Sequence, residues 1–203
     1  MKIICIGRNY LAHIKELGNV VPAEPVFFMK PDTSLLIRNR PFYYPDFSSD
    51  IHFEVELVLK ICTVGKNIQS KFAHTYFNEI GLGIDFTARD IQERSKKAGS
   101  PWFTAKGFDQ AAPVSRFIPK SAFPDLRNIS FRLDLNGHTV QQGNTSLMIY
   151  PFEEILVHAS RFFTLRMGDL IFTGTPAGVG PVTIGDLLEG YIEKERLLTC
   201  TIK

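Results

Sequence analysis

The stretch "IHFEVELVLK", residues 51–60, contains the strand that decides how this chain folds and what it can bind. Side chains alternate between the two faces of a strand, so Phe53 and Val55 would share one face and Glu54 and Glu56 the other. The alpha carbons of the two glutamates would lie roughly 6.5 to 7 Å apart, which lets their carboxylates converge. Like charges so placed repel each other unless water or a cation relieves them. The strand therefore predicts either a solvated sheet face or a divalent cation between two carboxylates.

Length and composition indicate one globular domain, residues 1–203. The chain has 203 residues, of which 44% are hydrophobic, and this is enough for a sizeable core. Its 23 Lys and Arg residues against 21 Asp and Glu residues give a net charge of +2. The one dense basic run, Arg94 to Lys97, is expected to be a solvated helix face, so we expect no nucleic-acid partner.

The sequence also favours a cytoplasmic protein without a membrane partner. No apolar run approaches the roughly 20 residues that a membrane span needs. The stretch "MKIICIG" meets Arg8 too early to act as a signal peptide. Three cysteines, Cys5, Cys62 and Cys200, are widely spaced in apolar runs, and we expect buried, reduced thiols.

Short runs typical of β-strands dominate the chain and predict a β-rich α+β fold. A hairpin is expected where Asn136 and Gly137 supply the positive backbone angles of a tight turn. One helix is expected from Thr87, as its N-terminal cap, to Gly99. A second follows Pro151 in "PFEEILVHASRFF". The strands are expected over 2–6, 25–29, 34–38, 52–62, 80–85, 129–135, 169–173 and 196–202.

A third carboxylate stands at Asp85, where an apolar strand ends just before the first of these helices. Alone, Asp85 would be read as a turn or cap residue, although the junction of a strand and a helix is a frequent place for functional groups. With Glu54 and Glu56 it makes three hard oxygen donors and no convincing His or Cys partner. This set suits Mg²⁺, Mn²⁺ or Ca²⁺ rather than zinc, and three ligands leave positions open for substrate and water.

His13 and Glu16 lie in "GRNYLAHIKELG", which predicts a short helix ending at Gly18. Spaced i and i+3, they would share one face, so the carboxylate could orient the imidazole as a general base requires. An exposed pair on a surface helix is the alternative. The segment "TGTPAGVGP", residues 173–181, offers backbone donors and the Thr175 hydroxyl to an anion, but it matches no nucleotide-binding motif.

Six segments, in this order, resemble the fumarylacetoacetate hydrolase family, and in particular its short acylpyruvase and oxaloacetate decarboxylase branch. They cover almost the whole chain, so the resemblance implies a single catalytic domain, residues 1–203, with the mixed-sheet roll of that family's C-terminal domain. The segments are "GRNYLAHIKE", "EPVFFMKP", "IHFEVELVLKI", "GIDFTARDIQ", "GSPWFTAKGFD" and "IFTGTPAGVGPV".

The resemblance also implies roles for individual residues, a Mg²⁺ or Mn²⁺ cofactor (Ca²⁺ in a crystal) and a homodimer. The expected metal ligands are Glu54, Glu56 and Asp85. The expected catalytic residues are His13 and Glu16, on a mobile lid, and Lys106. The expected substrate-binding residues are Arg8, Gln92 and Thr175.

The implied reaction is cleavage of a carbon–carbon bond in a small 2-oxo acid through a metal-stabilised pyruvate enolate. Acylpyruvate hydrolysis would use water activated by the His13 and Glu16 pair, whereas oxaloacetate decarboxylation needs no attacking water. An isomerase or decarboxylase of hydroxymuconate-type diacids is an alternative with the same enolate chemistry. A non-catalytic metal-binding module is a further alternative, but it would have no use for the pair or for Lys106.

Overall fold

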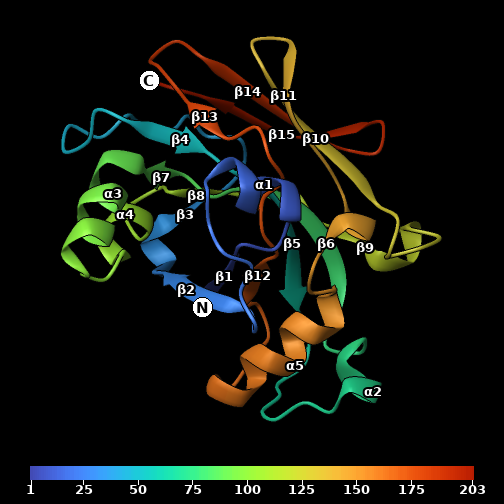
Figure 1. Cartoon of the computed structure of the whole chain (residues 1–203). Coiled ribbons are helices and arrows are strands. Elements are labelled where there is room, and N and C mark those ends of the chain that lie inside the picture. Colours follow the sequence, from blue (N-terminus) through green and yellow to red (C-terminus); the bar gives the residue numbers. More distant parts are fainter.

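The computed structural model describes residues 1–203 and consists of short strands, five α-helices and three 3₁₀ turns (Figure 1). The strands are β1 Ile3–Gly7, β2 Val26–Lys30, β3 Leu35–Leu36, β4 Ile51–Phe53, β5 Val55–Ile61, β6 Phe77–Ile84, β7 Thr87–Ala88, β8 Ala112–Pro113, β9 Ile118–Pro119, β10 Ser130–Leu135, β11 His138–Asn144, β12 Leu170–Phe172, β13 Gly180–Pro181, β14 Leu187–Ile192 and β15 Glu195–Thr201. The helices are α1 Leu11–Glu16, α2 Ser70–Ala73, α3 Arg89–Ala98, α4 Phe103–Lys106 and α5 Phe152–Phe162, and the 3₁₀ turns are Asp32–Ser34, Lys120–Ala122 and Thr145–Leu147.

The strands form mixed sheets, which confirms the α+β class. The largest sheet has the order β2-β1-β12-β5-β6-β9. In it β1 and β12 run parallel, whereas the other neighbours run antiparallel. A second, antiparallel sheet has the order β11-β10-β14-β15, and two small sheets, β13-β4-β7 and β3-β8, complete the fold. Helices α3 and α4 lie together on one side of the molecule, and α2 and α5 lie together at one end (Figure 1).

The main core lies where the four-stranded sheet packs against the six-stranded sheet, because β14 and β15 contact β6. A cluster of 35 buried apolar residues fills this region. Gly190 of β14 allows the sheets to approach closely, since a Cβ atom there would lie 2.3 Å from Cδ2 of Leu82. A larger side chain at this position would require the Leu82 side chain to move from its place in the core.

Both faces of β5 are buried, and this rules out the solvated sheet face. Val55 and Leu57 point into the main core, as expected, whereas Val58 on the opposite face belongs to a second apolar cluster. Glu54, which separates β4 from β5, is 5% exposed and Glu56 is 1% exposed. Two carboxylates therefore lie inside the protein, where each needs a compensating charge or hydrogen bond.

The other expected elements are mostly confirmed. Asn136 and Gly137 have φ values of 51° and 80° in the turn between β10 and β11. Helix α3 ends at Gly99 with a φ of 65°. Thr87 as the cap of α3 was wrong, because Thr87 belongs to β7 and the cap position is Ala88.

Helix α5 follows Pro151 as expected. The cysteines are unbonded, and Cys62 is only half-buried, unlike Cys5 and Cys200. Strand β14 was not among the expected strands. None of the helices has the length and apolar character that crossing a membrane requires.

Candidate active site

Three carboxylates meet beside the junction of β4 and β5. Strand β5 pairs with β6 in a register that sets Val55 opposite Ile84, and the Asp85 amide donates to the Glu54 carbonyl at 2.7 Å. This pairing brings the end of β6 next to Glu54. One carboxylate oxygen from each of Glu54, Glu56 and Asp85 lies within 4.8 Å of the other two, and all three residues are buried. The carboxylates of Glu54 and Glu56 therefore converge, as the strand pattern indicated, and Asp85 joins them.

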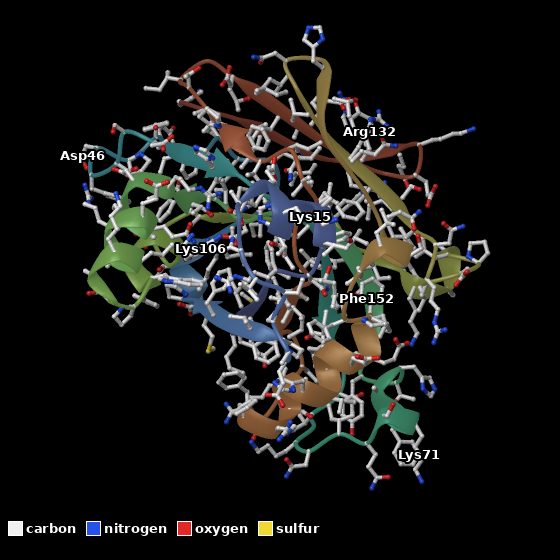
Figure 2. All side chains as sticks on the ribbon, in the orientation of Figure 1. Lys15, Asp46, Lys71, Lys106, Arg132 and Phe152 are labelled. Carbon is white, nitrogen blue, oxygen red and sulfur yellow. The ribbon has the colours of Figure 1, made fainter.

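Buried cations surround the three carboxylates. Lys106 Nζ, at the end of α4, donates to Glu54 Oε2 at 2.8 Å and to Asp85 Oδ2 at 2.7 Å (Figure 2). Arg89 Nη2, at the start of α3, donates to Glu54 Oε1 at 2.6 Å. Lys30 Nζ, at the end of β2, lies 2.7 Å from Asp85 Oδ1. Three positive groups therefore face three buried carboxylates.

The cations act unequally on the carboxylates. Burial alone would raise the pKa of Glu54, but the charges of Lys106 and Arg89 outweigh it and lower that pKa. Burial, and then the nearby Asp85 charge, raise the pKa of Glu56 well above its usual range. Burial would lower the pKa of Lys106, but Asp85 and Glu54 outweigh it and raise that pKa. Glu56 is thus the carboxylate with the least compensated charge.

The cluster fits a divalent cation. Asp85 Oδ1 is buried without a hydrogen-bond donor, since Lys30 approaches it as an ion pair rather than along a directed hydrogen bond. Glu56 accepts one hydrogen bond, from the Gly174 amide at 2.7 Å. An oxygen that accepts one hydrogen bond keeps a lone pair for a metal ion. Buried carboxylate oxygens without nearby nitrogen or sulfur ligands suit Mg²⁺, Mn²⁺ or Ca²⁺.

The hydrogen bond from the Gly174 amide to Glu56 requires a glycine at position 174 and is supported by the buried Asn9. Gly174 has a φ of 99°, and a Cβ atom there would lie 2.6 Å from Cβ of Asn9. Asn9 is fully buried and donates to the carbonyls of Thr173, at 2.8 Å, and Tyr150, at 3.0 Å. Its Oδ1 atom accepts from the Tyr150 amide at 2.8 Å. Asn9 therefore joins the end of β1 to the glycine-rich loop beside Glu56.

His13 and Glu16 form the expected pair on α1. The Nδ1 atom of His13 lies 3.1 Å from Glu16 Oε2, and His13 is 6% exposed. The other Glu16 oxygen, Oε1, accepts from the Gly178 amide at 2.9 Å. An exposed pair is ruled out for His13, which lines the same cavity as the carboxylates. Helix α1 lies in front of the sheet in Figure 1.

The three expected substrate-binding residues also line this cavity. Gln92 Oε1 accepts from Arg89 Nη1 at 2.6 Å, and Thr175 Oγ1 accepts from Gln141 Nε2 at 2.8 Å. Arg8 contacts Asn19 at 3.2 Å. Of the nine expected site residues, Glu16 alone does not line the cavity, and it contacts His13 from outside.

Two buried cations of the site, Lys30 and Arg89, were not expected from the sequence. Arg89 precedes Gln92 by three residues on α3, and this spacing could have indicated a shared face with the expected substrate-binding residue. Lys30 ends an apolar strand and gave no such signal. Its ammonium is 0% exposed, and it reaches Asp85 because β2 lies against α4.

Comparisons with known proteins agree with this geometry. The model of the fumarylacetoacetate (FAA) hydrolase C-terminal family matches residues 2–203. The chain is 44% identical to the mitochondrial oxaloacetate decarboxylase of Dictyostelium discoideum, covering 93% of this chain and 87% of that protein. It is 41% identical to the oxaloacetate tautomerase YcgM of Escherichia coli strain K12, covering 98% and 91%.

A solved structure extends the comparison. Fumarylpyruvate hydrolase from Pseudomonas aeruginosa, in complex with Mn²⁺ and pyruvate, superposes with a TM-score of 0.94 at 34% identity, covering 100% of this chain and 89% of that one. These relatives are named as an oxaloacetate decarboxylase, an oxaloacetate tautomerase and a fumarylpyruvate hydrolase, and each of them is an enzyme. This chain belongs to the fumarylacetoacetate hydrolase family, and it is an enzyme.

Proposed function

We propose that this enzyme cleaves a carbon–carbon bond in a small 2-oxo acid and depends on a divalent metal ion. The reaction would be acylpyruvate hydrolysis, oxaloacetate decarboxylation, or both. The observation that carries the proposal is the buried cluster of Glu54, Glu56 and Asp85, with the Lys106 ammonium hydrogen-bonded to two of them at the floor of the cavity. The names of the relatives, an oxaloacetate decarboxylase and a fumarylpyruvate hydrolase, support the same substrate class.

In this proposal Glu54, Glu56 and Asp85 hold Mg²⁺ or Mn²⁺. When bound, the cation would act as a Lewis acid that polarises the 2-oxo and carboxylate oxygens of the substrate. The protein's own charges support this role. The three carboxylates are balanced by Lys30, Lys106 and Arg89, so a divalent cation would leave the site with an excess positive charge that favours an anionic substrate.

The residues of the cavity would bind the substrate and stabilise charge. Lys106 is a fixed, buried cation, and a preorganised cation stabilises an oxyanion most where water is excluded. Arg8, Gln92 and Thr175 supply donors around the same cavity and would orient the acid. A substrate held in this way would present the carbon atoms next to its 2-oxo group toward His13.

His13 and Glu16 would supply the proton transfers. The Glu16 carboxylate would accept a hydrogen bond from the Nδ1–H group and so leave Nε2 of the neutral imidazole as the free base. In hydrolysis, Nε2 takes a proton from water, the oxygen adds to C4, and the C3–C4 bond breaks with its electron pair moving to C3. The products are a carboxylic acid and pyruvate enolate, and protonation at C3 then gives pyruvate. Decarboxylation of oxaloacetate gives the same enolate and CO₂ without attacking water.

A second candidate function is the keto–enol tautomerisation of oxaloacetate. The same pair could take a proton from C3 and return it to oxygen, with no bond broken between carbons. Two observations favour this candidate: the buried His13 lines the cavity itself, and a relative at 41% identity is named an oxaloacetate tautomerase. The isomerase of hydroxymuconate-type diacids belongs to this same type of chemistry.

A substrate panel would decide between these functions. Purified protein with Mg²⁺ or Mn²⁺ would be assayed on acetylpyruvate, fumarylpyruvate, enol and keto oxaloacetate, and a hydroxymuconate-type diacid. We expect pyruvate to form from an acylpyruvate or from oxaloacetate. Enol-to-keto conversion without pyruvate would favour the tautomerase, and no conversion of any substrate would refute the proposal.

We also propose that residues 1–203 act as one catalytic unit and as a homodimer, which light scattering after size-exclusion chromatography would test.

A further inference from the structure

One face of α3 carries a row of polar residues from the carboxylate cluster to the mouth of the cavity. Arg89, Gln92 and Lys96 are spaced i, i+3 and i+7, so they share a face of the helix. Arg89 is 7% exposed and Gln92 is 4% exposed, whereas Lys96 is exposed. All three line the same cavity. The run Arg94 to Lys97 is therefore not only a solvated face, because one of its lysines faces the candidate active site.

Lys96 has no acidic partner. The inner cations Arg89, Lys106 and Lys30 each lie within 2.8 Å of a carboxylate oxygen. Lys96 makes no ion pair, and its nearest aromatic contact is Trp102, whose ring centre lies 5.9 Å from Nζ. Partial burial lowers the pKa of Lys96, and the charges of Arg89 and Arg8 add to this effect. The charge of Glu54 opposes this shift without reversing it, and no carboxylate forms an ion pair with Lys96.

Arg8 lies at the mouth of the same cavity, and no carboxylate balances its charge either. It forms no ion pair, its guanidinium contacts the neutral side chain of Asn19, and it lines the cavity with Lys96 and Trp102. The inner cavity thus holds matched charges, whereas the outer cavity holds two unmatched positive charges. Such a separation favours a ligand that carries a second negative charge away from the carboxylate cluster.

We propose that Lys96 binds the distal carboxylate of a 2-oxo dicarboxylic acid and so makes the enzyme select diacids over 2-oxo acids with neutral tails. This inference rests on the proposed function, since it assumes that the 2-oxo acid end lies at the carboxylate cluster. Lys96 and Gln92 line the same cavity, so a ligand that reaches from the carboxylate cluster past Gln92 would meet the lysine. Trp102 lines this part of the cavity too, and its ring centre lies 5.9 Å from Lys96 Nζ.

Binding of two matched ligands tests the role of Lys96. 2-Oxoglutarate and 2-oxopentanoate have the same chain length and the same 2-oxo acid end, and they differ in a terminal carboxylate or methyl group. Their dissociation constants would be measured by calorimetry in the presence of Mn²⁺. We expect wild-type protein to prefer the diacid, and Lys96→Met to weaken diacid binding about five- to tenfold, with monoacid binding nearly unchanged.

Two variants make the test specific. Lys97→Met removes the neighbouring lysine of α3, which does not line the cavity, and should leave both constants unchanged. Lys96→Arg keeps the charge and should keep the preference for the diacid. Equal weakening of both ligands in Lys96→Met, or no preference in the wild type, would overturn this inference while leaving the proposed function standing. Failure of both ligands to bind wild-type protein would count against the proposed function itself, and the inference would fall with it.

Discussion

Glu16 joins His13 to the glycine-rich loop: Oε2 lies 3.1 Å from His13 Nδ1, and Oε1 accepts from the Gly178 amide at 2.9 Å. One carboxylate therefore orients the imidazole and also holds α1 against the loop that follows β12. Gly178 has a φ of 98°, and a Cβ atom there would lie 2.2 Å from the Val140 carbonyl oxygen, so the loop geometry requires glycine. The position of the His13 imidazole thus depends on Glu16, which is itself held by the Gly178 amide.

The role of His13 separates the two cleavage reactions. If His13 activates water, His13→Ala should lower acylpyruvate hydrolysis by about 10²- to 10⁴-fold, the usual contribution of a general base. Oxaloacetate decarboxylation needs no attacking water and should fall at least about tenfold less. The measurement is kcat/KM for both substrates at saturating Mg²⁺, with Glu54→Ala as the comparison that should lower both alike. Equal losses in His13→Ala would instead assign the histidine to a shared step, such as enolate protonation.

The segment from Tyr10 to Pro22 is predicted to act as a lid. It is held at one end by Asn9 and at the other by the Tyr150 hydroxyl, which donates to the Pro22 carbonyl at 2.7 Å. Between these points Val20 is 80% exposed, whereas Tyr10 and Ile14 are buried, so opening would begin around Val20. Oxalate resembles pyruvate enolate in charge and shape, and with Mg²⁺ it should slow amide hydrogen exchange in residues 10–22. Exchange that oxalate leaves unchanged would argue against a lid.

Metal binding should release a proton from Glu56. In the metal-free protein, burial and the Asp85 charge raise the pKa of Glu56 well above 4.5, so its carboxyl stays protonated to a higher pH than usual. A metal ion requires the carboxylate, so Mn²⁺ affinity should rise with pH up to that raised pKa and then level off. Calorimetry in buffers of different ionisation heat counts the protons released. Glu56→Gln should abolish the release, and heats independent of buffer in the wild type at about pH 5.5 would contradict this assignment.

Asn9 should matter for stability as well as for the site. Asn9→Ala would leave the Thr173 and Tyr150 carbonyls and the Tyr150 amide without their side-chain partner in a buried region. We expect the free energy of unfolding to fall by about 2 to 4 kcal/mol, measured by urea denaturation. Asn78→Ala, at an exposed position of β6, is the control and should change it by less than about 0.5 kcal/mol. A loss no larger than that of the control would mean that water replaces these bonds.

The sequence was informative where a local pattern determines the structure. The alternation in residues 51–60 identified the row of Phe53, Val55 and Leu57, and the asparagine and glycine of the hairpin fixed a turn by their backbone preferences. The convergence of Glu54 and Glu56 could be expected from their i and i+2 spacing, whereas Asp85 lies beside them because β5 and β6 pair with Val55 opposite Ile84. The resemblance to a family then added Lys106, whose ammonium lies among these carboxylates.

Other features depend on tertiary contacts that no local pattern encodes. Lys30 was not singled out in the sequence, yet it is buried against Asp85 at the end of β2, which packs beside α4. The same holds for Thr87, which looked like a helix cap but accepts a hydrogen bond from Lys106 at 2.6 Å. Burial of both faces of β5 was not apparent either, since a strand of alternating polarity usually has one solvated face.

The central claim is that the carboxylate cluster holds the divalent cation on which the reaction depends. The most direct measurement is kcat/KM for the best substrate of the panel in protein stripped of metal, before and after Mg²⁺ or Mn²⁺ is added. We expect stripping to abolish turnover and the added cation to restore it in the wild type but not in Glu56→Ala, which keeps the apolar face of β5 and loses one ligand. Full turnover in stripped wild-type protein, or in Glu56→Ala, would contradict the account.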